Sequence, residues 1–153
     1  MSLNEEVELL RRIPLFAKIE PSKLKLLAFT SQRLTYKPGD VLFRQGDPGD
    51  AAFVIIGGEA NVVVDTPTGP LTVAHLKHND FVGEIAILCD VPRTATVSAA
   101  SEVTTLRIEK DLFFRLINDF PQIAVEIMRV LAQRLERTTA DLRTLSARVK
   151  NSG

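Results

Sequence analysis

The residues that could do chemistry gather between Phe81 and Val97, in the run F-V-G-E-I-A-I-L-C-D-V-P-R-T-A-T-V. Gly83 lets the backbone come close to a ligand, and the free N–H groups at the start of the helical turn that follows favour negative charge. Arg93 adds a planar, permanently charged fork suited to phosphate. Glu84 accepts hydrogen bonds only, when ionised, so it suits a ribose hydroxyl better than a phosphate. Together these residues predict a nucleotide pocket.

This run resembles the phosphate-binding cassette of cyclic nucleotide-binding domains. Such domains occur in catabolite activator proteins, in regulatory subunits of cyclic-AMP-dependent protein kinase and in cyclic-nucleotide-gated channels. The family pattern reads roughly F-G-E-x-A-L-x-x-x-x-P-R-x-A-x-V, and this chain departs from it by placing Val82 directly before Gly83. A second stretch, residues 36–59, is similar to the glycine-punctuated early strands of the same family.

The resemblance implies a role for each cassette position. Arg93 would bind the cyclic phosphate and Glu84 the ribose, while the backbone N–H groups of Ala86 and Ala95 would reach the phosphate. Thr94 would hydrogen-bond the phosphate without deciding which base is bound. Each residue also has a structural alternative. Arg93 could be an ordinary surface arginine, and Glu84 could be an acid that stabilises the first turn of a helix. Thr94 could be a strand residue that is present for its β-propensity.

The resemblance also assigns four positions to the nucleotide base: Val73, Leu76, Thr138 and Thr139. Aligned with the dimer helix of the catabolite activators, the two threonines fall on the residues that contact adenine, one from each subunit. A threonine in an apolar seam needs a hydrogen-bond partner, which is either a base or a carbonyl of its own helix. Val73 and Leu76 could equally be core residues. The expected ligand is cyclic AMP, with cyclic GMP as the alternative.

The elements expected around the cassette make the chain mainly β with flanking helices. From residue 33 to 109, short β-branched runs separated by turn signals predict an all-β sandwich or barrel, and the resemblance makes it an eight-strand β-roll of the jelly-roll type. Amino-terminal helices are expected within 4–32 and carboxy-terminal helices within 110–149. Alternation from Leu71 to Leu76 predicts a half-buried strand. The whole chain, 1–153, is expected to be one cyclic nucleotide-binding domain.

Periodicity predicts that the last helix, from Pro121 to about Val149, pairs with a second copy of the chain. Apolar residues recur along it in alternating steps of four and three, with only Thr138 polar: Ala124, Met128, Leu131, Leu135, Leu142, Leu145 and Val149. This is the a/d pattern of a coiled coil, and it extends beyond what one small β-roll can cover. We therefore expect a parallel homodimer. The alternative is a helix folded back on its own domain.

The composition argues against several function classes. The chain carries 19 acidic and 19 basic side chains, so it lacks the basic stripe of a nucleic-acid binder. No apolar run is long enough to span a bilayer, and the acidic segment 4–8 is unlike a secretory signal. A single cysteine, Cys89, suits a reducing cytoplasm and is expected to be a small apolar filler.

Metal and enzyme chemistry are also not expected. His75 and His78 are three residues apart in a predicted strand, so they point to opposite faces, and no third ligand lies nearby in the sequence. The chain shows no Ser/His/Asp arrangement and no paired carboxylates. The predicted function is a cyclic nucleotide sensor that signals through its last helix to an unknown partner protein. The alternatives are a module excised from a larger transcription regulator, kinase or channel, a degenerate roll that binds no nucleotide and serves as a scaffold, and a cupin-like enzyme.

Overall fold

The computed structural model describes residues 3–152, and the side chains of residues 3–149. The chain divides into two compact units, Met1–Arg115 and Leu116–Gly153. The helices are α1 (Leu3–Arg11), α2 (Pro21–Thr30), α3 (Glu84–Leu88), α4 (Lys110–Asp119) and α5 (Pro121–Ser152), with a 3-10 turn, η1, at Pro14–Phe16. The strands are β1 (Gln32–Tyr36), β2 (Val41–Phe43), β3 (Ala51–Gly57), β4 (Ala60–Thr66), β5 (Gly69–Leu76), β6 (Phe81–Val82), β7 (Thr96–Ala99) and β8 (Val103–Glu109).

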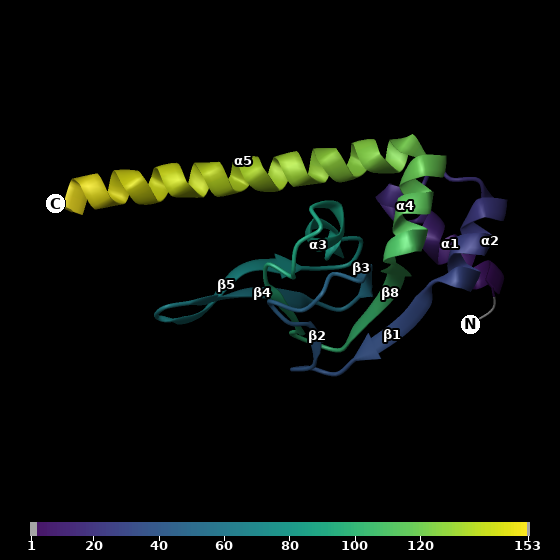
Figure 1. Cartoon of the computed structure of the whole chain (residues 1–153), viewed down its shortest axis with the longest axis horizontal. Helices are drawn as coiled ribbons and strands as arrows, with labels where there is room; N and C mark the ends of the chain where they lie inside the picture. Colours follow the sequence, from purple (N-terminus) through teal and green to yellow (C-terminus); the bar gives the residue numbers. More distant parts are fainter. Residues whose placement is uncertain (1–2, 153) are drawn as a thin grey trace. The chain divides into compact units, whose positions relative to one another are not determined.

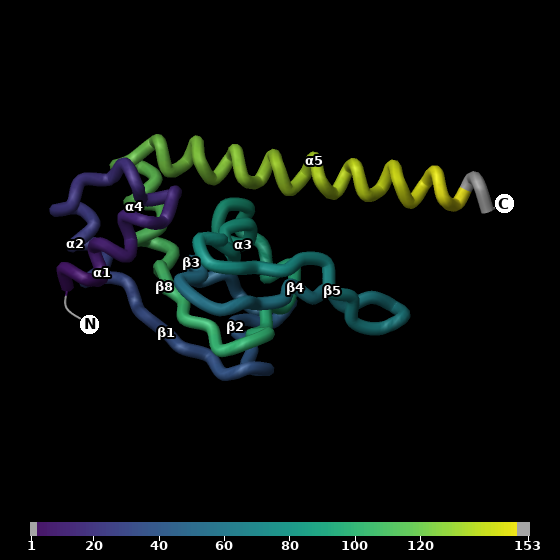
Figure 2. Tube along the Cα trace, turned by 180° about the vertical axis from the view of Figure 1, so that it is seen from behind, coloured from purple at the N-terminus to yellow at the C-terminus, as the bar shows by residue number. Residues whose placement is uncertain are grey.

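Within the described residues, the strands form two four-stranded antiparallel sheets (Figure 1). One sheet has the order β1-β8-β3-β6 and the other β2-β7-β4-β5. Neighbours in each sheet are mostly distant in sequence, which is the connectivity of a jelly roll. Figure 2 shows the β4–β5 hairpin extending past the other strands of the roll. The expected eight-strand roll between amino-terminal helices and a long carboxy-terminal helix is therefore confirmed.

The core lies between the two sheets, because both contribute apolar side chains to one buried cluster. Alternate residues of β3 point into it, as the two-residue period of a strand requires. The buried members of the cluster are Ala51, Phe53, Ile55, Ala60, Leu76, Val82, Val97, Ala99 and Val103. Burial of each large side chain contributes about 1.5–3 kcal/mol, so this cluster fixes how β3 and the strands around it are placed.

Two expectations about single residues are wrong. The strand from Leu71 to Leu76 is not half-buried: Leu71 and Val73 are exposed, because the β4–β5 hairpin extends past the other strands, which therefore do not cover it (Figure 2). Cys89 is exposed rather than an apolar filler, because it caps the carboxyl end of α3. Alternation and residue type alone do not indicate whether a second layer covers a position.

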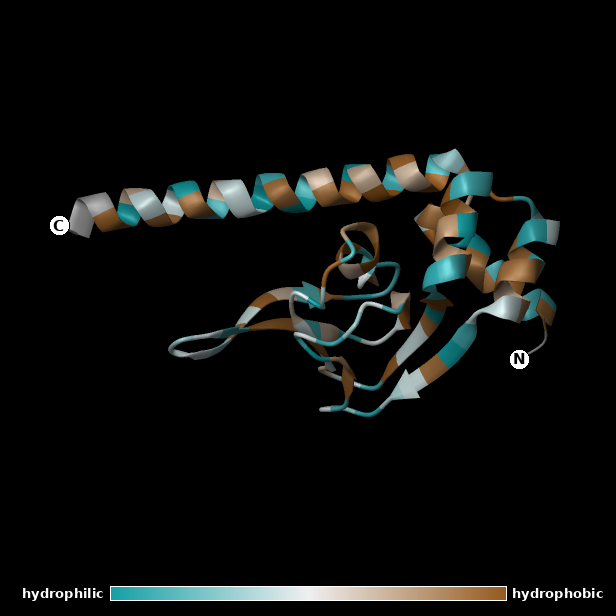
Figure 3. Ribbon diagram, viewed as in Figure 1, coloured by the Kyte–Doolittle hydropathy of each residue, from teal (hydrophilic) through white to brown (hydrophobic). Residues whose placement is uncertain are grey.

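Helix α5 runs without interruption from Pro121 to Ser152, and its first residue is a proline, which has no N–H to lose at that position. Figure 3 shows apolar residues recurring along it. Ile123 and Ile127, near its start, are buried, whereas the later members of the expected seam are exposed: Met128, Leu135, Leu142, Leu145 and Val149. Among the described residues, no helix combines the length and the apolar composition that a membrane span requires.

Candidate functional site

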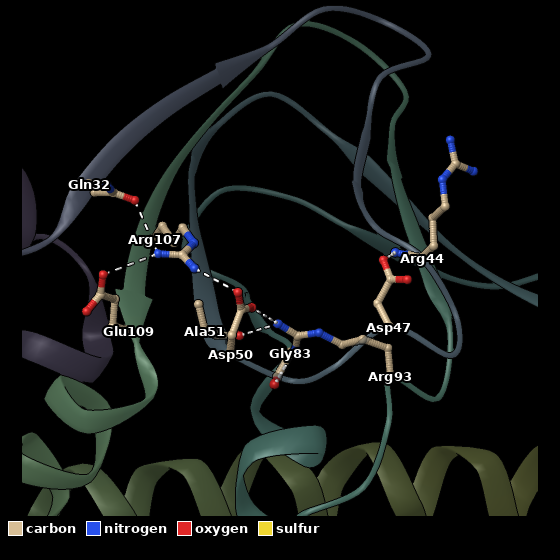
Figure 4. Close-up of polar contacts among 9 residues, drawn as sticks. All are labelled: Gln32, Arg44, Asp47, Asp50, Ala51, Gly83, Arg93, Arg107 and Glu109. Carbon is tan, nitrogen blue, oxygen red and sulfur yellow. Dashed lines mark hydrogen bonds and ion pairs between the residues drawn. The ribbon is translucent and has the colours of Figure 1, made fainter.

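Arg93 is the centre of the site, and it is not a surface arginine. The residue is 3% exposed. Its Nη1 donates to the carbonyl oxygen of Gly83 at 2.7 Å, and its Nη2 donates to the carbonyl oxygen of Ala51 at 2.6 Å. Nη2 also lies 3.5 Å from Oδ1 of Asp50 (Figure 4). The guanidinium carbon is 4.1 Å from the centre of the Phe43 ring. These contacts hold the guanidinium in one orientation.

The hydrogen bonds of Arg93 leave one edge of its guanidinium unfilled. Nε is buried and has no acceptor among the described residues. A buried donor without an acceptor costs about 1–3 kcal/mol, so such groups are rare in folded proteins. Burial lowers the pKa of Arg93, although the nearby carboxylate of Asp50 acts in the opposite direction. Since a guanidinium keeps its proton in proteins, the site holds a buried cation with a donor still available.

Gly83 brings the start of α3 into direct contact with the Arg93 side chain. It caps the amino end of α3 with φ 91° and ψ 0°, a left-handed conformation that glycine adopts without strain. A Cβ at this position would lie 2.7 Å from Nη1 of Arg93 and 3.1 Å from the carbonyl oxygen of Ala51. The sequence predicted a close approach of the Gly83 backbone to a ligand. In the structure, the close approach at this glycine is to the arginine itself.

Helix α3 places Glu84 near this cation and carries Ala86 two residues later. Glu84 is 1% exposed, and its charge is among those that raise the pKa of Arg93. Ala86 packs against the loop before β3: a Cβ on Gly49 would collide with the Ala86 side chain and lie 3.1 Å from its carbonyl carbon. The sequence analysis did not assign Gly49 to the site. Its only signal there is the turn pattern Asp47-Pro48-Gly49.

The segment that follows Arg93 is held by backbone hydrogen bonds to the loop between β2 and β3. The Arg93 N–H donates to the carbonyl of Asp47, and the Gly46 N–H donates to the carbonyl of Arg93, both at 2.8 Å. Thr94 is exposed and Ala95 is half-buried. Of the cassette residues, the structure thus places Gly83 and Glu84 beside the Arg93 guanidinium. Ala86 packs against Gly49, and Thr94 and Ala95 follow Arg93 in the chain.

The four positions assigned to the base have separate environments. Leu76 is part of the core between the sheets, whereas Val73 is 53% exposed on β5. In α5, Oγ1 of Thr138 donates to the carbonyl of Arg134 at 3.0 Å, and Oγ1 of Thr139 donates to the carbonyl of Leu135 at 2.9 Å. Both hydroxyls thus bond the carbonyl four residues earlier. The two threonines belong to the second compact unit, and Val73 and Leu76 belong to the first.

Asp50 extends the site to a second arginine that the sequence analysis missed. Its Oδ2 lies 3.0 Å from Nη2 of Arg107 on β8. Arg107 also donates to Oε1 of Gln32 at 3.2 Å and lies 3.7 Å from Oε1 of Glu109 (Figure 4). No sequence motif marks this chain of contacts, because Asp50 and Arg107 meet only through the pairing of β3 with β8.

No metal centre competes with this interpretation in the described part of the chain. Among the described residues, no group of three His, Cys, Asp or Glu side chains is placed to hold a metal ion. Nδ1 of His75 lies 2.6 Å from Oδ1 of Asn61 on the neighbouring strand.

The chain is similar to known proteins in both sequence and fold. The model of the cyclic nucleotide-binding domain family matches residues 33–120. The CRP-like cAMP-activated global transcriptional regulator of Mycobacterium tuberculosis is 33% identical over 90% of this chain and 62% of its own length. The cAMP-dependent protein kinase regulatory subunit of Dictyostelium discoideum is 31% identical over 87% of this chain and 40% of its own. The crystal structure of the Thermus thermophilus catabolite activator protein superposes with a TM-score of 0.76, at 28% identity, over 87% of this chain and 63% of that one.

The chain spans less than two thirds of the length of these proteins. The family match covers more than half of the chain, from β1 to the end of α4, and includes the whole cassette. The buried arginine, the glycine at the start of α3 and the eight-strand roll all lie inside the matched region. On this evidence the chain belongs to the cyclic nucleotide-binding domain family.

Proposed function

We propose that this chain is a regulatory module that binds a cyclic nucleotide, cyclic AMP in preference to cyclic GMP. The observation that carries the proposal is the buried guanidinium of Arg93, whose Nε has no acceptor among the described residues. A phosphate oxygen is the acceptor that best suits a fixed, charged donor. The names of two relatives, a cAMP-activated regulator and a cAMP-dependent kinase subunit, favour cyclic AMP.

Each cassette residue then has a task in binding. The phosphate accepts from Nε of Arg93, and the backbone N–H groups of Ala86 and Ala95 and the hydroxyl of Thr94 surround its other oxygens. Glu84 accepts from the ribose hydroxyl, because a carboxylate that accepts only cannot pair with phosphate. The base positions are proposed separately for each compact unit. Val73 and Leu76 are the candidates in the first unit. In the second, the hydroxyls of Thr138 and Thr139 would bond the base edge in place of their helix carbonyls.

We further propose that ligand binding is transmitted through α5. A ligand shifts a conformational equilibrium only by binding one state more tightly than the other, so α5 must have two positions that the ligand distinguishes. The exposed seam of α5 favours a homodimer, in which a second copy would cover it. The module would act on a downstream protein or domain rather than as an enzyme, in keeping with the regulatory names of its relatives.

The test is calorimetric titration with cyclic AMP and cyclic GMP. Replacing Arg93 with alanine should weaken cyclic nucleotide binding by about 2–4 kcal/mol, or about 30- to 1,000-fold, because a charge-assisted phosphate contact is lost. Arg44→Ala is the matched control, since Arg44 is an exposed arginine near the same loop. Unchanged affinity in Arg93→Ala would rule out the proposed site and favour a scaffold that binds no nucleotide.

A further inference from the structure

We propose that Asp50 makes this site select the singly charged cyclic phosphodiester over the doubly charged open nucleoside monophosphate. The inference rests on the proposed function, because it concerns the anion that Arg93 receives. It assigns a specificity-determining role to a residue outside the cassette. The competing ligand is a nucleoside 5′-monophosphate. It has the same base and ribose as the cyclic nucleotide and differs only in its phosphate group.

The positive charge of Arg93 is already largely balanced before any ligand arrives. Three carboxylates act on its guanidinium, those of Asp50, Glu84 and Asp47, against one other cation, Arg107. Among these acidic groups, Asp50 has the largest effect, and its Oδ1 lies 3.5 Å from Nη2 of Arg93. One negative charge can still approach the unfilled Nε edge favourably. A second negative charge would face the carboxylates of Asp50, Glu84 and Asp47, while Arg107 is already paired with Asp50.

Two arginines favour the position of the Asp50 carboxylate beside this site, although its side chain is 68% exposed. Its Oδ2 lies 3.0 Å from Nη2 of Arg107, and Arg107 also contacts Gln32 and Glu109. The Asp50 backbone carbonyl accepts from the N–H of Lys110 at 3.0 Å, which holds the main chain at this point. From this position the carboxylate would act on an anion that binds Arg93.

The difference in charge between the two ligands depends on pH, because only the monophosphate changes its charge in the range used here. A cyclic phosphodiester has one ionisable proton and carries a single charge at any pH used here, whereas a phosphate monoester takes up its second proton near pH 6. At pH 8 the monophosphate is thus doubly charged. An added charge near a fixed carboxylate in a partly exposed site changes affinity by about tenfold.

The experiment measures the affinities of cyclic AMP and 5′-AMP by calorimetry at pH 8, in the unmodified chain, in Asp50→Asn and in Glu109→Gln. We expect the preference for cyclic AMP to shrink by about tenfold in Asp50→Asn, because the monophosphate gains more than the cyclic ligand. Glu109→Gln removes another carboxylate that contacts Arg107 but not Arg93, so its preference should not change. A purely structural role, in which Asp50 only positions Arg93, would change both affinities equally.

Measuring the same preference as a function of pH separates the effect of the ligand's charge from the effect of its shape. In the unmodified chain, the preference should fall as the pH drops from 8 to 5.5, because the monophosphate becomes singly charged, and in Asp50→Asn this dependence should be flatter. The charged groups facing Arg93 are Asp47 and Asp50 from the loop before β3, Glu84 from α3 and Arg107 from β8.

Three results would overturn the role of Asp50. They are equal affinities for the two ligands at pH 8, an unchanged preference in Asp50→Asn, or a preference in the unmodified chain that does not vary with pH. Each of these leaves binding of cyclic AMP intact and so leaves the proposed function standing. Loss of all cyclic nucleotide binding by the unmodified chain would instead contradict the proposed function, and this inference with it.

Discussion

At the scale of single residues, the proposed function gives different atoms of Arg93 different tasks. Nη1 and Nη2 donate to backbone carbonyls of two segments, while Nε, which has no acceptor among the described residues, would donate to the anion. A lysine could not do both, since its ammonium is a point charge on a flexible stem and has no second edge. The type of cation at this position therefore matters as much as its charge.

Arg93→Lys is expected to bind cyclic nucleotide more weakly by about tenfold at neutral pH, because the fork is lost. Its affinity should also fall further as the pH rises towards 10. A lysine begins near pKa 10.4, and the burial that lowers the pKa of Arg93 would lower that of the lysine as well. Binding needs the cation, so affinity is present below that pKa and lost above it. The unmodified chain should show no such loss, and parallel pH profiles of the two would contradict this prediction.

At the scale of elements, the position of α3 depends on the loop that precedes β3. Gly49 and Ala86 touch so closely that no side chain fits between them. The loop before β3, which contains Asp50, therefore also fixes the position of α3, which contains Glu84. A change in this loop is therefore expected to move the ribose and phosphate contacts together.

Gly49→Ala should lower the free energy of unfolding by about 1–3 kcal/mol, the usual cost of overpacking, and should also weaken cyclic nucleotide binding by displacing the Ala86 N–H. Urea unfolding and calorimetry would measure the two effects. Gly57→Ala is the matched control, because a Cβ there meets nothing within 4 Å. If Gly49→Ala unfolds like the control and binds as tightly, α3 does not depend on this contact.

The cassette could be predicted from the sequence because its residues are close together along the chain. Gly83, Glu84 and Arg93 lie within one short run, so their spacing alone carries the pattern. Asp50 and Arg107 could not be predicted, because they meet only once β3 pairs with β8. The exposure of Val73 likewise depends on the β4–β5 hairpin extending past the other strands (Figure 2), which the alternation of residues in β5 does not reveal.

At the scale of the whole molecule, the exposed seam of α5 is the strongest indication of a larger assembly. Leu142 and Leu145 are 60% and 57% exposed, although each would contribute about 1.5–3 kcal/mol if buried. The charged side chains beside the seam, such as Arg134 and Asp141, would set the register of two helices more than their stability. Pairing of two such seams should outweigh the entropy of association at micromolar concentrations.

We expect the unmodified chain to sediment as a dimer at tens of micromolar, and Leu142→Glu combined with Leu145→Glu to give folded monomers, because like charges would face each other in the seam. Ala140→Glu combined with Ala147→Glu is the control, since these exposed positions lie on the side of α5 opposite the seam and add the same charge. If Thr139 of a partner completes the base site, the monomers should also bind cyclic AMP more weakly. An unmodified chain that sediments as a monomer would refute the dimer.

The exposed position of Cys89 has a practical consequence. It is the only cysteine in the sequence, and it follows directly after α3, in the middle of the cassette. A maleimide dye or a nitroxide would therefore attach at one defined point without any engineered residue. The label would be a few residues from Glu84 on one side and Arg93 on the other, so its emission or line shape could report in real time how the cassette responds when a nucleotide is added.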